Sequence, residues 1–413
     1  MRKNIFKTVK AGILFGALII CLSACSGGND SSDNKPETEE PAYTIPVLPA
    51  NHAFVHPGIL QTQESLDYAK SKVQSGAQPW TSAWQFLESN YAQKTYSPNA
   101  VPVIQDLFAL TNDGHAAYIL AVKWAVSGDV EYAKSSIKIL DAWANTVTGF
   151  DLGINTTLRV GIGSIPMANA AEIIAHYNNG AANWPKTQQD KMKSLFKNVL
   201  FPCVNSSSTE KGGRSGNWGT APLDGIIAMA IFCEDMEMLK YGYDAYFYGF
   251  PGKDGCAGVA QYIWHENGQD CESGRDQGHP QGGVSDLVEA ALALKNQGFD
   301  VVPFARYRLV AGIEYLAKYN LGNDVTFYKP MPNPCGNYPA SYENGVSPNN
   351  KGEFAPIYEM ASYLFGDQPH PFTKGVIASS NFRYYPNTAT GGVYLPERST
   401  GDSPGCGTLL YRK

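Results

Sequence analysis

The sequence has few charged residues and no surplus of positive charge. Only 17% of its 413 residues are charged, and 38 acidic residues outnumber 32 Lys and Arg. Proteins bind nucleic acids largely through Lys and Arg contacts with phosphates, so this balance excludes a nucleic-acid-binding protein. An acidic protein can still bind an anionic polymer if its few cations are concentrated where the carboxylates must lie.

Closely paired cysteines are also missing. Cys21 and Cys25 lie near the N-terminus, and the other six cysteines are spaced irregularly with no CxxC pair. This spacing does not predict a cysteine-ligated zinc cluster. An oxidising compartment permits disulfides, but the sequence does not choose among the pairings. The six residues are Cys203, Cys233, Cys256, Cys271, Cys335 and Cys406.

One apolar run stands out at the N-terminus, and it is too short to span a bilayer as a stable helix. Residues 11–22 follow a basic segment that contains four Lys or Arg and no acidic residue. This arrangement is typical of a signal peptide. The run ends in Leu-Ser-Ala-Cys over 22–25, which resembles the lipobox of bacterial lipoproteins. We therefore expect Cys25 to become the lipidated first residue; an ordinary signal peptide with an incidental cysteine is the alternative.

The segment after Cys25 is expected to be a tether. Residues 26–50 are rich in Ser, Gly, Asp, Glu and Pro, a composition that cannot bury enough apolar surface to fold. An acidic, Ser-rich stretch at this place resembles the surface-export signal of Bacteroidetes lipoproteins. The expected organisation is a removed leader over 1–24, a tether over 25–50 on the outer membrane, exposed to the periplasm or the cell surface, and one domain over 51–413. Loss of four positive charges with the leader changes the net charge from −6 to about −10.

From about residue 60 the sequence shows little period-two alternation, which argues against a mostly β fold. Apolar residues instead recur at helical spacing between Gly, Pro and Asn. The segment 113–126 is one example, and Gly128-Asp129 ends it before a second helix over 130–146, so the two predict an antiparallel hairpin. Further helices are predicted over 61–75, 165–177, 186–198, 222–247, 257–264, 283–294, 303–319 and 354–364.

A long series of helical hairpins in one domain predicts an all-α fold. The expected architecture is an (α/α)n toroid or incomplete barrel, in which each hairpin buries its apolar stripe against its neighbours around a central cleft. An open α-solenoid is the alternative, but no fixed-period repeat favours it. The C-terminal segment, rich in Gly, Pro, Thr and Tyr, is expected to be irregular chain or short strands. The protein is expected to be a monomer.

Two polar, glycine-rich segments lie where predicted helices begin. The first reads Gly-Gly-Arg-Ser-Gly-Asn-Trp-Gly-Thr-Ala-Pro over 212–222, and the second reads Asp-Cys-Glu-Ser-Gly-Arg-Asp-Gln-Gly-His-Pro-Gln-Gly-Gly over 270–283. Helix entrances on one rim of a toroid project side chains and free N–H groups into the cleft. In the second segment Arg275 and His279 are four residues apart, as are two glutamines, so a helical turn places each pair on a common face.

These segments resemble the alginate lyase superfamily of helical-toroid polysaccharide lyases. The resemblance rests on the Asn217-Trp218 turn and on Glu272-x-x-Arg275 followed by a ring-bearing side chain, and it covers about residues 55–365. Among the families of this superfamily, the chain is most similar to polysaccharide lyase family 38, whose members act on alginate or glucuronan. The resemblance implies cleavage of a uronic-acid polymer by β-elimination to unsaturated oligouronides, with no cofactor and no catalytic metal.

The residue types fit this chemistry. β-Elimination removes the C5 proton of a uronate and expels the O4 oxygen, while negative charge accumulates on the C6 carboxylate, so donors to that carboxylate act mainly on the transition state. The resemblance implies that Asn217 and Arg275 are these donors, assisted by Gln277 or Gln281. His279 is the expected base, because an imidazole with its ordinary pKa of about 6.5 is neutral at the working pH.

The chain departs from the best-known toroid pattern at two places. Where those lyases have a histidine directly after the asparagine, this chain has Trp218, which leaves His279 as the base. Where they have the tyrosine that donates a proton to the leaving oxygen, this chain has Gly282. That tyrosine must come from elsewhere, and Tyr338 and Tyr342 are the candidates.

Aromatic side chains near the polar segments are candidate contacts for sugar rings. The chain has 24 Tyr and 7 Trp, and Trp218, Trp264 and His265 lie beside the two segments. His115, near the start of the predicted helix over 113–126, is a further candidate for lining the cleft, although its position on an amphipathic helix favours a structural role.

The candidates also have structural explanations, and other functions stay open. His279 could cap a helix, Arg275 could form a salt bridge with Glu272, and Asn217 could be an N-cap. The chain could be a surface lipoprotein that binds glycan without cleaving it. It could also be a helical-toroid glycoside hydrolase with two carboxylates as acid and base. The acidic candidates for that chemistry are Asp224, Glu266, Asp270, Glu272 and Asp276.

Overall fold

The computed structural model describes residues 43–105, 108–206, 216–251, 257–329, 340–379 and 406–413. The leader, Cys25, most of the predicted tether, Cys256, Cys335 and Tyr338 lie outside the described residues. No helix in the described ranges combines the length and the apolar character that crossing a bilayer requires.

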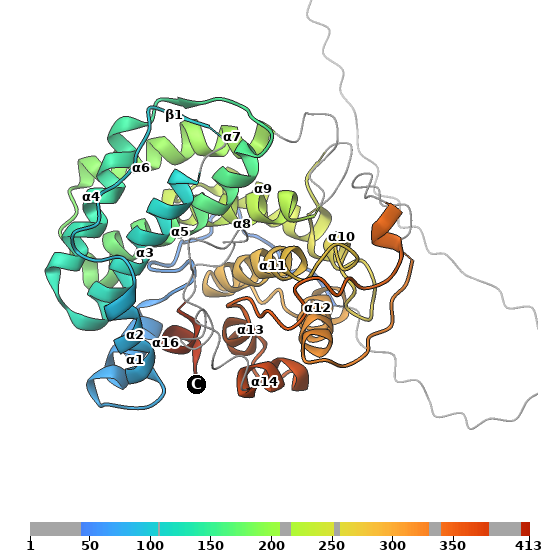
Figure 1. The fold of residues 1–413 in the computed structure, drawn as a ribbon. Coiled ribbons are helices and arrows are strands. Elements are labelled where there is room, and N and C mark those ends of the chain that lie inside the picture. The colour runs from blue at the N-terminus through green and yellow to red at the C-terminus, as the bar shows by residue number, and fades with distance from the viewer. Residues whose placement is uncertain (1–42, 106–107, 207–215, 252–256, 330–339, 380–405) are drawn as a thin grey trace, which may run out of the picture. The chain divides into compact units, whose positions relative to one another are not determined.

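Helices dominate the described part of the chain (Figure 1). Two short strands, β1 Val103–Ile104 and β2 Gly149–Phe150, pair in parallel. A π-helical turn, Phe196–Leu200, joins α6 to α7, and a 3₁₀ turn spans Ala340–Glu343. The helices are α1 Gln63–Gln74, α2 Trp80–Asn90, α3 Ala109–Ser127, α4 Val130–Thr146, α5 Thr156–Gly180, α6 Lys186–Leu195, α7 Phe201–Ser206, α8 Asn217–Cys233, α9 Met236–Tyr248, α10 Val259–Tyr262, α11 Gly278–Asn296, α12 Phe304–Asn320, α13 Tyr358–Phe365, α14 Pro371–Ala378 and α16 Gly407–Tyr411.

The long helices α3, α5, α8 and α11 pack side by side in chain order and form the inner layer (Figure 1). The intervening helices α4, α9 and α12 pack against this layer and return the chain to its starting end. The domain is therefore the expected all-α toroid of paired helices, and the fold prediction is confirmed. In the C-terminal segment α14 and α16 are helices, where irregular chain or strands were expected, and residues 380–405 lie outside the described residues.

The inner helices run parallel, and glycines set their relative heights. A Cβ at Gly161 of α5 would lie 2.7 Å from the backbone N of Pro222 in α8, and a Cβ at Gly225 of α8 would lie 2.9 Å from the carbonyl O of Gly161. Only glycine permits so close a contact between two helix backbones. Farther round the layer, Thr220 of α8 donates to Asp286 of α11 at 2.6 Å. The polar turns that precede α8 and α11 consequently lie at the same end of the domain.

The inner helices are buried on nearly every side. In α8 all residues from Gly219 to Cys233 are buried, including Asp224. A helix that is apolar all round has its place inside a domain. Of the cysteines that the structure describes, Cys203, Cys233 and Cys406 carry free thiols, and burial raises the pKa of each thiol to about 12. These thiols are therefore packing groups rather than reactive ones.

Candidate active site

The start of α8 lies directly against the loop that precedes α11. The backbone N–H of Asn217 donates to Oε2 of Glu272 at 2.9 Å. Gly216, just before it, has φ 62° and ψ −148°, a conformation that is essentially restricted to glycine. A Cβ at Gly216 would lie 2.6 Å from Cδ of Glu272. The two polar segments of the sequence thus meet at one carboxylate, and only a glycine allows the contact.

Glu272 joins the two segments. Its side chain is buried, and its oxygens accept hydrogen bonds from Asn217, from the Tyr262 hydroxyl at 3.0 Å and from Nη1 of Arg275 at 2.9 Å. The same hydroxyl lies 3.3 Å from the carbonyl O of His279. A buried carboxylate is costly unless such partners surround it, so removing it would separate the groups it holds. The turns at 217 and 279 therefore lie next to each other, as the sequence predicted.

Arg275 forms a salt bridge with Glu272, which is the structural role considered for it from the sequence. Its side chain also faces outward. Its Nε lies 3.8 Å from Asp276, while 31% of its side chain stays exposed. Burial alone would lower the pKa of Arg275, but the charge of Glu272 raises it. The guanidinium is therefore fixed in position, permanently charged and partly open to solvent, as a donor to a ligand carboxylate must be.

His279 is oriented by Asp276. Its Nδ1 lies 2.6 Å from Oδ2 of Asp276, and its side chain is 27% exposed. The other oxygen of Asp276 accepts from the backbone N–H groups of Gly278 and His279 at the start of α11. Burial alone would raise the pKa of Asp276, but these hydrogen bonds with His279 and Gly278 lower it. With Nδ1–H donated to an ionised Asp276, the lone pair of the imidazole is on Nε2.

Tyr342 joins the same group of residues. The carbonyl O of Tyr342 would be 2.1 Å from a Cβ at Gly274, so the 3₁₀ turn lies directly on the loop of Arg275. Burial raises the pKa of the Tyr342 hydroxyl, and the positive charge of Arg275 opposes the shift. Tyr338, the other candidate, lies outside the described residues.

Gln281 does not face the site, contrary to the expectation. Its side chain is only 1% exposed. Its Oε1 accepts from the N–H of Ala355 at 2.9 Å and from the Tyr358 hydroxyl at 2.8 Å. Its Nε2 donates to the carbonyls of Gln277 at 2.6 Å and Glu353 at 2.8 Å. All the hydrogen-bonding capacity of this amide is used within the protein, which leaves none for a sugar carboxylate.

Gln277 is a second correction of the same kind. It is fully buried, its Nε2 donates to the carbonyl of Ser347 at 3.0 Å, and its Oε1 accepts from Nδ2 of Asn320 at 2.9 Å. Both glutamines therefore fasten the segment after the 3₁₀ turn, and α12 and α13, to the start of α11. They stabilise the loop that carries the site and do not contact a ligand.

The aromatic candidates have mixed placements. Trp218 is half-buried and packs on Leu158 and Ile162 in the first turns of α5. Trp264 is also half-buried, and the His265 ring is stacked on Tyr328 with centroids 3.8 Å apart, so one face of that imidazole is already covered.

His115 is buried inside the inner layer. Its Nδ1 donates to the carbonyl of Thr111 at 2.7 Å, one turn earlier in α3. The structure therefore gives this histidine the structural role that its position on an amphipathic helix favoured.

Sequence reasoning missed Arg159. This residue lies in the first turn of α5, with its guanidinium carbon 3.6 Å from the centroid of the Phe108 ring. Its neighbours Leu158 and Ile162 pack against Trp218, so a second cation lies near the start of α8. The signal was an arginine in an otherwise apolar stretch. It was overlooked because the predicted helix began at residue 165, whereas α5 begins at Thr156.

The five acidic candidates for a hydrolase site are each engaged with other groups of the protein. Asp224 is buried beside α11, and burial raises its pKa well above the usual range. Asp270 is buried and accepts from the backbone of Glu272 and the hydroxyl of Ser273. Asp276 and Glu272 are occupied as described above, and Glu266 is an exposed residue that pairs with Arg306.

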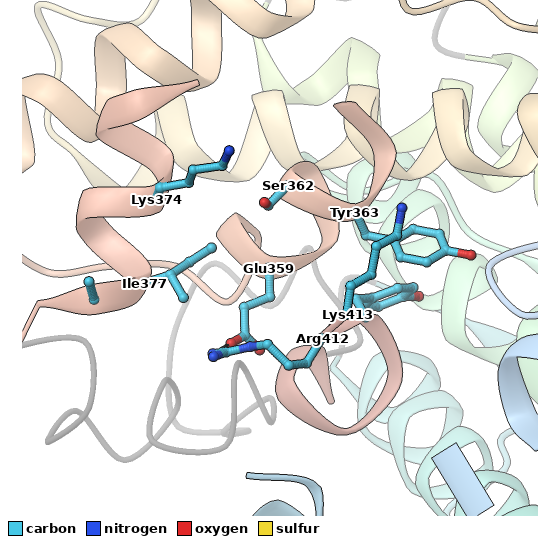
Figure 2. A pocket seen from close by; sticks show the side chains of 9 residues that line it. Glu359, Ser362, Tyr363, Lys374, Ile377, Arg412 and Lys413 are labelled. Carbon is cyan, nitrogen blue, oxygen red and sulfur yellow. Dashed lines mark ion pairs between the residues drawn. The ribbon is translucent and has the colours of Figure 1, made fainter. Parts of the chain in front are cut away.

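A separate cavity of about 300 Å³ lies among α13, α14 and the C-terminal residues. Figure 2 shows Glu359 of α13 beside Arg412, with Lys374 of α14 on another side of the cavity. Glu359 is buried and forms an ion pair with Arg412, which fixes the C-terminal end to α13. None of the candidate site residues lines this cavity, so it is distinct from the polar turns.

Comparisons with known proteins identify the class of enzyme to which the chain belongs. Alginate lyase A1-III from Sphingomonas species A1 superposes with a TM-score of 0.57 at 13% identity, over 89% of this chain and 100% of that one. A variant of alginate lyase A1-III complexed with tetrasaccharide gives 0.59 at 12% identity, over 86% and 97%. An alginate lyase from Bacteroides ovatus gives 0.54 at 14% identity, over 86% and 99%. No curated protein matches the sequence.

At these identities the superpositions establish the fold, which is that of the helical-toroid polysaccharide lyases. The sequence itself establishes the family: the Alginate lyase family model matches residues 62–327, about two thirds of the chain, so the chain belongs to that family. The protein is a polysaccharide lyase.

Proposed function

We propose that this lyase cleaves a uronic-acid polymer, either mannuronate-containing alginate or glucuronan, by β-elimination, and releases unsaturated oligouronides. The observation that carries the proposal is that Asn217 and Arg275 both bind the buried carboxylate of Glu272, with His279 at the start of α11 beside them and the Tyr342 backbone against the same loop. The four residues come from two helix entrances and one 3₁₀ turn. Together they supply a carboxylate donor set, a base and a proton donor, which are the three functions that β-elimination needs.

In this proposal Arg275 and Asn217 bind the C6 carboxylate. The partly exposed guanidinium of Arg275 is held by Glu272 and can approach the carboxylate without reorganisation. Oδ1 of Asn217 is buried and has no hydrogen-bond partner among the described residues. Buried polar atoms normally have a partner, so a hydroxyl group of a bound sugar is the natural donor to this oxygen. Nδ2 of the same amide then faces the carboxylate.

His279 is the proposed base and Tyr342 the proposed acid. Nε2 of His279 removes the C5 proton, and Asp276 stabilises the imidazolium that results. The bond between C4 and O4 then breaks, and the Tyr342 hydroxyl gives its proton to the departing O4. Because burial raises the pKa of Tyr342, the hydroxyl keeps this proton at neutral pH until the leaving oxygen needs it. Trp218 and Trp264 are proposed to flank the adjoining sugar rings.

The substrate can be tested directly. The purified protein is incubated with polymannuronate, polyguluronate and glucuronan, and the near-ultraviolet absorbance of the unsaturated uronate is followed. Absorbance should rise with polymannuronate or glucuronan, and the His279→Ala variant should give no rise. Release of saturated chain ends without an absorbance change would mean hydrolysis, and a rise with polyguluronate alone would overturn the proposed preference.

We also propose that the protein acts as a monomer anchored to the outer membrane through Cys25. The support is the basic leader, its short apolar run and the Leu-Ser-Ala-Cys ending. Metabolic labelling with a tagged fatty acid should mark the wild-type protein and should fail with Cys25→Ser. Labelling that persists in the variant would contradict the anchor.

A further inference from the structure

Two histidines and a glutamate meet at the far end of α5. Glu172 and His176 are one turn apart on this helix, and His56 comes from the segment before α1. Glu172 lies about 20 Å along the helix axis from Arg159, at the rise of an α-helix. The cluster is therefore remote from the candidate active site, and what it binds does not depend on the proposed lyase chemistry.

The three side chains already offer ligand atoms to one point. One nitrogen of each histidine and one oxygen of Glu172 lie within 4.8 Å of one another. Nδ1 of His56 is 2.7 Å from Oε1 of Glu172, and Nε2 of His176 is 3.8 Å from Oε2. Ligands of a tetrahedral zinc ion lie about 3.4 Å apart, which follows from metal–ligand bonds of about 2.1 Å. To enclose an ion, His176 must therefore move closer to Glu172, and Nδ1 of His56 must move slightly away from it.

The orphan atoms in this cluster need an explanation. Oε2 of Glu172 and Nε2 of His176 are buried and have no hydrogen-bond partner among the described residues. Oε1 of Glu172, in contrast, accepts from His56 and from the backbone N–H of Gly58 at 3.0 Å. The glutamate is only 1% exposed, and a buried carboxylate with an unused oxygen beside an unused imidazole nitrogen is unfavourable. A cation between them satisfies both atoms.

The surroundings suit a metal ion with imidazole ligands. Nε2 of His56 lies 3.7 Å from Oε1 of Glu234, a carboxylate whose other oxygen is bound by Lys193 at 2.8 Å. If Nδ1 of His56 binds an ion, its Nε2–H points at Glu234, which is the usual outer partner of a metal-bound histidine. Two imidazoles and one carboxylate favour zinc and similar transition metals over Mg²⁺ and Ca²⁺.

We propose that His56, Glu172 and His176 bind one divalent transition-metal ion of the zinc type, with a water molecule as fourth ligand. The ion takes the place of the proton on Nδ1 of His56, which is released to solvent. The two imidazole rings are stacked, with centroids 4.2 Å apart and planes 16° apart, so one ring must turn for both lone pairs to reach the ion. His176, with 27% of its side chain exposed, is the freer of the two. The bound ion clamps the segment before α1 to α5.

Metal content tests the proposal. Protein purified without a histidine tag is treated with a chelator, incubated with Zn²⁺, dialysed and analysed for zinc by mass spectrometry. The wild-type protein should retain one zinc per chain. His176→Gln should lower the affinity for zinc by at least about a hundredfold, since one of three protein ligands is lost. His52→Gln is the matched control, because His52 lies in the same segment but bonds to Gln297 instead, and it should retain zinc.

A second measurement keeps the proposal testable if the His176→Gln variant does not fold. Co²⁺ added to the wild-type protein should give the visible absorption of a four-coordinate site, and Zn²⁺ should displace that signal. Circular dichroism shows whether His176→Gln is folded. Wild-type protein that retains no zinc after dialysis would overturn the proposal. So would a folded His176→Gln variant that binds zinc as tightly as the wild type.

Discussion

Two pairs of side chains at the start of α11 have opposite roles. Arg275 is paired with Glu272 and Asp276, His279 is paired with Asp276, and the two side chains remain partly exposed, at 31% and 27%. Gln277 and Gln281 are buried and use their amide groups entirely on protein partners. The helical turn expected for Arg275 and His279 is not observed, because α11 begins at Gly278 and Arg275 lies in the loop before it. The two pairs differ in exposure because the segment after Glu343 packs on the two glutamines and leaves Arg275 and His279 uncovered.

The largest expected effect is on the open pair. Arg275→Ala and His279→Ala should each lower kcat/KM by about a thousandfold, because one variant loses the charge that stabilises the carboxylate and the other loses the base. The initial rate of unsaturated-product formation measures this effect. Circular dichroism should match that of the wild type. Rates within tenfold of wild type in either folded variant would place the active site elsewhere.

The buried pair should respond in the opposite way. Gln281→Ala should lower the free energy of unfolding by about 2–4 kcal/mol, since it leaves the N–H of Ala355 and the hydroxyl of Tyr358 without their partner. The rate per folded molecule should stay near that of the wild type. Urea denaturation gives the stability, and Gln85→Ala, an exposed glutamine on α2, is the control that should change neither quantity. A collapse of activity at unchanged stability would make Gln281 a substrate contact after all.

The contact between the two polar segments can be broken at a single glycine. Gly216→Ala should lower kcat/KM by about tenfold to a hundredfold, because its Cβ would clash with Glu272 and move the α8 entrance away from Arg275. Gly128→Ala is a well-matched control: Gly128 also has a positive φ, of 78°, but a Cβ there meets nothing within 4 Å. Both variants should lose about 1–2 kcal/mol of stability from backbone strain. Equal loss of activity in Gly216→Ala and Gly128→Ala would mean that the contact between Gly216 and Glu272 is not needed for activity.

The smallest predicted effect is a pH dependence of stability. Burial raises the pKa of Asp270 to about 7, and the hydrogen bonds from Ser273 and Glu272 oppose the shift. Since the unfolded chain ionises this carboxyl near pH 4, the folded state binds the extra proton between pH 4 and 7, and stability falls as the pH rises through that window. Asp270→Asn removes this titration. The difference in unfolding free energy between variant and wild type should move in favour of the variant by about 3 kcal/mol from pH 5 to pH 8. An unchanged difference would refute the assignment.

The sequence predicted the presence of the helical hairpins better than the residues at which their helices begin and end. The helix over 130–146 is α4 as observed, and its Asp129 N-cap supplied the signal. The predicted helix over 222–247 is wrong, because the chain turns at Glu234 in a left-handed conformation and α9 starts after the N-cap Asp235. The start of α5 was missed because Gly161 looks like a helix breaker. Its absent side chain is instead what allows α8 to pack.

The convergence of the two polar segments was also predictable, whereas the partners of each side chain were not. Helix entrances on one rim must lie close together in a parallel inner layer, and the structure places Asn217 against Glu272 accordingly. Nothing local in the sequence told Gln281 from His279, because the residues that cover one of them lie more than seventy positions later. The pair of His56 and Glu172 is separated by 116 residues and has no local signal at all.

The parallel inner layer has an electrical consequence for an acidic protein. Each helix has a partial positive charge at its first turn, from backbone N–H dipoles that point the same way. Because α3, α5, α8 and α11 begin at one end of the domain, these fields add there without any contribution from ionisable side chains. At α8 and α11 these fields act on the carboxylates of Glu272 and Asp276, which accept from the first backbone N–H groups, so the helix ends help to hold the two acidic side chains that fix Arg275 and His279.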